Sequence, residues 1–179
     1  MPDLVPPTSR VRVSFIAAMD EFRAEGRGGP EDQSMVGAEI RYYGATWADP
    51  ERFEEYAGHV RDEALDATPR PAGYVPSTTL WWIDGDEYLG RIAIRHQLTP
   101  HLLDYGGHIG YDIRPSARLR GHATAMLART LPVAAALGID PVLITCDEDN
   151  IGSRKVIESN GGRFEDQRGI KLRYWVPTS

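Results

Sequence analysis

The sequence GHIGYDIRPSARLRGHATAMLA, residues 107–128, carries the clearest structural signal in the chain. Apolar and polar residues alternate from its first residue to Ile113, a pattern typical of a half-buried strand. Because Pro115 cannot donate a hydrogen bond to a neighbouring strand, we expect the strand to end there. A basic turn follows, and from Ala123 onwards apolar residues recur at helical spacing. The stretch therefore predicts a strand, a turn and a helix that opens near Gly121.

The turn between this strand and this helix combines features that suit an anion. Arg114, Arg118 and Arg120 bring guanidinium groups, which form charge-assisted hydrogen bonds with phosphate. Gly121 allows the backbone to approach a ligand closely. The first amides of a helix have no partner within it, and together with the helix dipole they attract negative charge. The turn is therefore a candidate phosphate site, although an ordinary turn with surface arginines would share this pattern.

Similar signals divide the rest of the chain into short elements. Asp84-Gly85 between two β-rich segments predicts a hairpin, and Asp49-Pro50 is typical of a helix start. Pro132 predicts a kink near Ala128 or two abutting helices. Residues 27–48 show no clear period and are expected to form loops with a turn of helix. We expect strands at about 4–5, 78–83, 88–95, 107–113, 141–146, 163–166 and 170–176, and helices at about 9–25, 49–67, 121–138 and 150–161.

Two motifs connect the chain to a known family. The segment RLRGHA, Arg118 to Ala123, fits R/Q-x-x-G-x-G/A and resembles the acetyl-CoA pyrophosphate loop of the GNAT acetyltransferase superfamily. Ile113-Arg114-Pro115 resembles the V-x-P that ends the family's fourth strand. A second family feature follows at the right distance, with Asn150 to Ser153, a helix, and then Asn160 to Phe164. The resemblance implies an α+β GNAT fold, with helices flanking a mixed central β-sheet, and it is best over about 78–176.

The resemblance also implies a cofactor site and a reaction. Acetyl-CoA would be the co-substrate, attacked directly by a primary amine of a small molecule or peptide in a ternary complex. The pantetheine arm would pair with the fourth strand, and the pyrophosphate would lie on the amides of the loop. The implied cofactor-binding residues are Ile113, Arg114, Arg118, Leu119, Arg120, Gly121, His122, Ala123, Thr124, Asn150 and Ser153. The loops at 27–48 and 96–106 would surround the acceptor.

The catalytic residues are less clear than the cofactor loop. His108 is the candidate general base, because an unperturbed imidazole titrates near neutral pH. It lies near the position where some relatives carry a strand glutamate. The alternative is a structural histidine that is hydrogen-bonded at the start of the strand. Asp112 shares the same face and is a weaker candidate, because a carboxylate must be desolvated to act as a useful base.

The general acid is in question because many relatives carry a tyrosine where this chain has Ile157. Isoleucine cannot donate a proton, so either Tyr111 takes this role or the thiolate leaves without help. The missing tyrosine also supports a second hypothesis, a non-catalytic acyl-CoA-binding sensor on the same fold. A ping-pong route through Cys146 is weaker than its interpretation as a small buried residue at a strand end.

Composition and charge narrow the class of protein. The chain has 179 residues, 41% of them apolar and 26% charged, which is typical of one globular domain. Its net charge of −6 argues against a nucleic-acid partner. No apolar run reaches the roughly 20 residues that span a membrane, no signal segment is evident, and the single Cys146 fits a cytoplasmic protein. We expect no metal site, and a homodimer through strand residues Leu172–Trp175 stays open.

Overall fold

The computed structural model describes all 179 residues of the chain. The strands are β1 (Asp3–Val5), β2 (Ser77–Asp84), β3 (Glu87–Arg95), β4 (Ile109–Ile113), β5 (Val142–Asp147), β6 (Arg163–Arg168) and β7 (Lys171–Val176). The α-helices are α1 (Arg12–Ala24), α2 (Met35–Tyr43), α3 (Pro50–Asp62), α4 (His122–Ala136) and α5 (Ile151–Ser159). Short helical turns are η1 (Ser9–Val11), η2 (Gly44–Thr46), η3 (Leu102–Gly106) and η4 (Pro115–Ala117).

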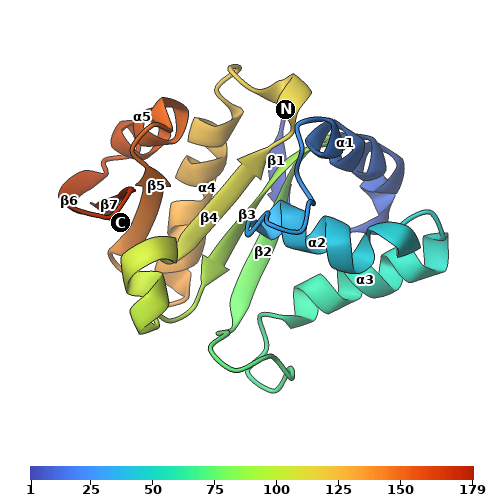
Figure 1. Cartoon of the computed structure of the whole chain (residues 1–179), viewed down its shortest axis with the longest axis horizontal. Coiled ribbons are helices and arrows are strands. Elements are labelled where there is room, and N and C mark those ends of the chain that lie inside the picture. The colour runs from blue at the N-terminus through green and yellow to red at the C-terminus, as the bar shows by residue number, and fades with distance from the viewer.

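The strands form one mixed sheet in the order β1-β2-β3-β4-β5-β7-β6. Every neighbouring pair is antiparallel except β4 and β5, which run parallel. Helices α1, α2 and α3 cover one face, while α4 lies behind the strands on the other (Figure 1). The predicted α+β class with a mixed central sheet is therefore confirmed.

Two adjacent tryptophans show how the sheet divides the core. Because successive side chains of a strand point to opposite faces, Trp81 and Trp82 of β2 belong to different clusters. Trp81 packs with Phe15 and other side chains of α1 to α3, whereas Trp82 belongs to the cluster that contains Leu127 of α4 and Ile157 of α5. Both tryptophans are buried. The sheet is thus covered on both faces, and these aromatic residues stabilise its packing.

Side-chain caps define several helix starts. The Asp49 carboxylate accepts hydrogen bonds from the amides of Glu51 and Arg52 at the start of α3. The Asn150 side-chain oxygen accepts one from Ser153 at the start of α5. Both starts were predicted, and such caps each contribute about 1 kcal/mol to helix stability. The hairpin at Asp84-Gly85 is also confirmed.

Helix α2 was not predicted. It begins after Ser34, whose hydroxyl accepts a hydrogen bond from the amide of Gly37 at 3.1 Å. Its buried residues are Val36, Gly37 and Ile40, which is too short a pattern to identify a helix in the sequence. The helix depends instead on its packing against α1 and the sheet.

Helix α4 continues through Pro132 as one element, so the prediction of two abutting helices is wrong. Proline removes one hydrogen bond, here the one that the carbonyl of Ala128 would accept. Both residues are at least partly exposed, so water can replace the lost donor. Met126, Leu127, Thr130 and Ala134 of the same helix are buried, and their packing holds it in place.

Two further predictions are wrong. Helix α3 ends at Asp62 and not near Ala67, because the Arg70 guanidinium donates to the carbonyls of Glu63 and Leu65 and so stabilises a turn where the helix would continue. The Leu172–Trp175 segment cannot pair with a second copy of the chain, because β7 already lies between β5 and β6. None of the helices combines the length and the apolar character that a membrane crossing requires.

Candidate functional site

A cleft opens where the two parallel strands separate. Strands β4 and β5 pair only at Ile109 and Ile144, and no later residue of β4 has a partner on β5. The resulting cavity has a volume of about 530 Å³ and is lined by both strands, the start of α2, the start of α5 and the 101–106 segment. Unpaired strand edges expose backbone donors and acceptors. The cleft can therefore bind an extended ligand along β4.

The turn after β4 presents a series of free backbone amides. The amides of residues 119–124 donate to no acceptor of the protein. Gly121 has a φ of 80°, a left-handed conformation that glycine adopts readily. Leu119 has a φ of 62°, which is strained for a leucine and is typical of functional sites. This geometry, at the N-terminus of α4, provides an anion site made of backbone.

Two of the three arginines of the turn do not face this anion site. Arg114 donates to Glu21 at 2.7 Å and to Ser14 at 3.1 Å. Arg118 donates to both carboxylate oxygens of Glu25, at 2.6 and 2.9 Å, and to the carbonyl of Ile113 at 3.2 Å. Both guanidinium groups therefore fasten the turn to α1, contrary to the expectation that they bind phosphate. Arg120 is exposed and takes part in no ion pair.

The contacts between the turn and α1 lower the pKa of the Glu21 carboxylate on α1. Partial burial alone would raise the pKa of Glu21, but hydrogen bonds from the amide of Ser116 and from Arg114 lower it. Glu21 is therefore ionised and binds the turn from two sides, through Arg114 and through Ser116. The turn keeps its shape by contacts that leave its amides free.

Tyr111 points from β4 towards α5 across the cleft. Its hydroxyl lies 2.7 Å from the hydroxyl of Ser153, and both residues line the cavity. Burial raises the pKa of Tyr111 to about 12, so its hydroxyl keeps its proton at neutral pH. Ile157, at the position of the family tyrosine, is fully buried in the core. The cleft thus contains a tyrosine hydroxyl, but it comes from a strand and not from α5.

His108 joins the two strands at the closed end of the cleft. Its backbone amide donates to the carbonyl of Leu143 at 2.7 Å, and its Nδ1 accepts from the amide of Leu143 at 2.8 Å. The side chain is buried, and burial lowers the pKa of the imidazole to about 4, with a further contribution from Arg95. The premise of an unperturbed imidazole is therefore wrong, and the geometry matches the structural alternative.

The remaining candidates occupy defined positions. Asp112 forms an ion pair with Arg27 at 3.0 Å. Nδ1 of His122 accepts from the indole of Trp82 at 3.3 Å, so this side chain packs on the sheet beside the free amides. Ala123 and Thr124 follow in the first turn of α4. Cys146 lines the cleft but is buried, and burial raises the pKa of its thiol, which disfavours a thiolate nucleophile.

Sequence reasoning pointed to the 27–48 and 96–106 segments but named none of the individual residues at the other end of the cleft. Arg27, Met35, Arg95 and Tyr105 line it there, from the α1–α2 connection, α2, β3 and η3. Arg27 also donates to Ser34 at 3.2 Å and so orders the α1–α2 connection. No motif or period marks these residues, and only the tertiary fold brings their four elements together.

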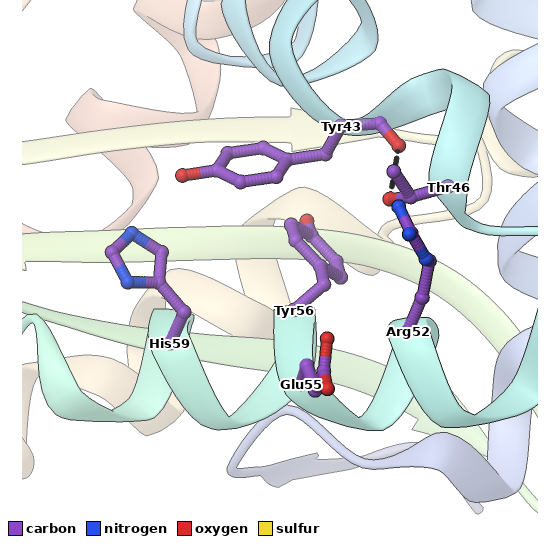
Figure 2. A pocket seen from close by; sticks show the side chains of 6 residues that line it. All are labelled: Tyr43, Thr46, Arg52, Glu55, Tyr56 and His59. Carbon is purple, nitrogen blue, oxygen red and sulfur yellow. Dashed lines mark hydrogen bonds between the residues drawn. The ribbon is translucent and has the colours of Figure 1, made fainter.

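A second, smaller hollow of about 240 Å³ lies between α2, η2 and α3. Figure 2 shows the Tyr43 ring lying opposite Tyr56 and His59 of α3. The ring centroids of Tyr43 and Tyr56 are 5.2 Å apart. This hollow shares no lining residue with the cleft between β4 and β5. Only the larger cleft is lined by β4 and β5, the strands that separate beyond Ile109.

Comparisons with known proteins agree with this geometry. Three solved structures resemble this fold. They are Mycobacterium smegmatis RimJ in complex with CoA-disulfide (TM-score 0.65, 17% identity, 98% of this chain and 80% of that chain), the ribosomal-protein-S5-alanine acetyltransferase of Vibrio fischeri (0.64, 11%, 98% and 91%) and the PaiA N-acetyltransferase of Thermoplasma acidophilum in complex with coenzyme A (0.57, 12%, 99% and 99%). No curated protein matches the chain by sequence.

A family profile matches a larger part of the chain than any single motif does. The family described as "Acetyltransferase (GNAT) domain" matches residues 33–163, well over half of the chain. The matched range contains most of the residues that line the cleft, the free amides and α5. The chain therefore belongs to the GNAT family and is a GNAT-type N-acetyltransferase.

Proposed function

We propose that the protein transfers the acetyl group of acetyl-CoA to a primary amine by direct attack in a ternary complex. The observation that carries this proposal is the succession of two features along one strand, the separation of β4 from β5 and the free amides at 119–124 in the turn that follows β4. A ternary complex places amine and thioester side by side, and placement alone supplies much of such a rate enhancement. The acceptor is a small molecule or a peptide.

The pyrophosphate of the cofactor binds at the start of α4. The free amides from Leu119 to Thr124 donate to its oxygens, and the helix dipole adds to the attraction. Arg120 is the arginine of the turn that is free to contact phosphate. Arg114 and Arg118 contribute indirectly, because their ion pairs with α1 hold the turn in place.

The pantetheine arm lies along the free edge of β4, beside Tyr111 and Ile113. Because β5 does not pair with β4 there, an extended arm can add to the sheet like another strand. Asn150 and Ser153 line the opposite wall at the start of α5. The side-chain oxygen of Asn150 caps the helix, which leaves its NH₂ group available to the arm.

Tyr111 assists departure of the thiolate. Its hydroxyl lies in the cleft, is positioned by Ser153, and keeps its proton at neutral pH because burial raises its pKa to about 12. A hydroxyl of this kind donates a hydrogen bond to the charge that develops on sulfur. The buried His108 is not assigned as the base. The amine loses its proton to solvent before or during attack.

Calorimetry with coenzyme A and a thiol-release assay over a panel of amines test this proposal. We expect coenzyme A to bind to the folded protein and acetyl-CoA to release thiol with at least one amine. Binding without turnover on any acceptor would favour the acyl-CoA sensor instead. Absence of binding would contradict both functions. The cytoplasmic location and the single-domain organisation expected from the sequence stay predictions.

A further inference from the structure

Two arginines on the same face of β3 have different surroundings. Arg91 is buried and forms an ion pair with Glu39 of α2 at 2.5 Å. Arg95 lies four residues further along the strand, so alternation places it on the same face. Arg95 is partly buried and takes part in no ion pair. The strand thus carries a buried guanidinium that is paired with a carboxylate and a partly buried one that is not.

No carboxylate of the protein offsets the positive charge of Arg95. One nitrogen, Nη1, donates to the carbonyls of Gly106 and Gly107, at 3.0 and 3.2 Å. Its other nitrogens have no protein acceptor within hydrogen-bonding distance. Burial and the charge of Arg91 both lower the pKa of Arg95. A shielded charge is expensive unless an opposite charge faces it, and the protein provides none at this position.

The free side of Arg95 faces the cleft. Arg95 lines the cavity beside Gly110. Gly110 follows Ile109, the last residue of β4 that pairs with β5. A methyl group added at Gly110 would lie 3.5 Å from Nη2 of Arg95 and 3.1 Å from the terminal methyl of Met35. The space between Arg95, Met35 and the strand edge is therefore open only because position 110 has no side chain. Gly110 lies near the start of β4, whereas the free amides follow the end of that strand.

The other cations of the cleft are already neutralised. Arg27 forms ion pairs with Asp112 at 3.0 Å and with Asp32 at 3.4 Å. Lys171 forms an ion pair with Asp147 at 2.5 Å. Among the arginines and lysine of the lining, only Arg95 lacks a carboxylate. A ligand in this part of the cleft can supply it.

We propose that Arg95 binds a carboxylate of the acceptor, so that the acceptor is an amine with a carboxylate close to its amino group. The inference rests on the proposed function and adds the chemical class of the acceptor. A guanidinium forms two parallel hydrogen bonds with a carboxylate, which fixes both the position and the orientation of the ligand. The α-carboxylate of a free amino acid and the acidic side chain of a peptide share this chemistry.

Paired acceptors test the proposal directly. Each pair exchanges a carboxylate for an amide of similar shape: L-alanine and L-alaninamide, β-alanine and β-alaninamide, and peptides that begin Ser-Asp and Ser-Asn. Because the carboxylate also raises the pKa of the amine, each rate is expressed per neutral amine. In at least one pair, we expect kcat/KM of the wild type to favour the carboxylate by about tenfold or more, as for a charge-assisted hydrogen bond. In Arg95→Met this preference disappears through a higher KM, and Arg95→Lys recovers part of it. The amino-acid and peptide arms identify which source is used.

Control measurements separate this effect from general damage. Arg52→Met removes an exposed arginine in the second hollow and should keep the preference. Coenzyme A affinity, measured by calorimetry, should be unchanged in Arg95→Met. If Arg95→Met instead lowers kcat equally for the acid and the amide of each pair, Arg95 acts on the thioester and the proposal is wrong. An unchanged preference in Arg95→Met also overturns it.

A binding experiment distinguishes failure of this inference from failure of the proposed function. N-acetylalanine, N-acetyl-β-alanine and acetyl-Ser-Asp need no turnover to bind. We expect at least one of them to raise the unfolding temperature of the wild type more than its amide does, and to lose this effect in Arg95→Met. If such binding occurs while no amine is acetylated, the inference stands and the proposed function fails. If amines are acetylated with no Arg95-dependent preference in either experiment, the proposed function stands and the inference fails.

Discussion

The turn after β4 and the cleft between β4 and β5 are built from different parts of the chain. In the turn, consecutive residues 119–124 leave their backbone amides without a protein acceptor. In the cleft, side chains from the α1–α2 connection, α2, β3 and η3 meet. A backbone site needs only a local conformation, which a short motif can specify. A side-chain site needs distant elements to pack, so its chemistry differs between proteins that share one fold.

Substitution of Tyr111 should have the largest effect on turnover, because its side chain lines the cleft and its hydroxyl is the proposed donor to the thiolate. Tyr111→Phe removes the only tyrosine hydroxyl that contacts Ser153, and we expect kcat to fall by about a hundredfold, the lower range for loss of a catalytic acid. Coenzyme A affinity should stay within about threefold, because binding depends on backbone contacts. Single-turnover rates and calorimetry measure the two quantities.

A matched control for this variant is Tyr174→Phe, which removes a tyrosine hydroxyl bonded to Glu158 outside the cleft lining. Its kcat should be close to that of the wild type. A Tyr111→Phe enzyme with undiminished kcat would show that the thiolate leaves without help.

Gly121→Ala should weaken coenzyme A binding by about tenfold, because alanine disfavours the left-handed φ of 80° and the shift would move the free amides. Gly138→Ala is the matched control. Gly138 has a φ of 77° at the other end of α4, and neither position has an atom within 4 Å of an added methyl group. Both variants should lose about 1 kcal/mol of stability, but only Gly121→Ala should lose affinity. Equal affinities of the two variants for coenzyme A would exclude a backbone site.

Substitutions of Arg118 and Arg120 in the turn should have smaller effects on coenzyme A affinity, and these effects should differ. Arg118 is neutralised by Glu25, with both side chains partly exposed, so Arg118→Gln should change coenzyme A affinity by less than about threefold. Arg120→Gln should weaken it by about threefold to tenfold at low salt and less at high salt, because an exposed charge is screened. Calorimetry at two salt concentrations measures both. A larger effect at Arg118 than at Arg120 would mean that Arg118 leaves Glu25 when the cofactor binds.

His108→Asn should have the smallest effect on turnover. An asparagine oxygen can replace Nδ1 as the acceptor for the amide of Leu143, and we expect kcat/KM to change by less than about twofold between about pH 6 and 9. Loss of activity that is strongest near neutral pH would restore His108 as the base.

The same histidine should make the stability of the wild type depend on pH. The pKa is about 4 in the folded protein and 6.5 in the unfolded chain. Between these values the unfolded chain binds more protons, so stability rises with pH. The free energy of unfolding is therefore highest above pH 6.5 and decreases by at most about 3 kcal/mol as the pH falls towards 4. Denaturant unfolding should therefore show a smaller decline over this window in His108→Asn.

Local signals in the sequence predicted most elements and the strand–turn–helix junction. Alternation identified β4, and the helix starts at Asp49 and Asn150 followed from residues whose side chains cap the first turn. Gly121 was recognised because its conformation is set by neighbouring residues. By contrast, α2 was missed, and the contacts that Arg114 and Arg118 make with α1 were not foreseen. Their partners, such as Glu21 and Glu25, lie more than ninety positions away.

The sequence by itself determined the α+β class, the strand–turn–helix junction and the family, because each depends on contacts between residues close together in the chain. Only the tertiary structure decided the character of His108, which burial against β5 makes a poor base, and of Arg95, which the sheet leaves without a counter-ion. The charge state and accessibility of a side chain depend on what surrounds it in space, and residues far apart in the chain supply those surroundings.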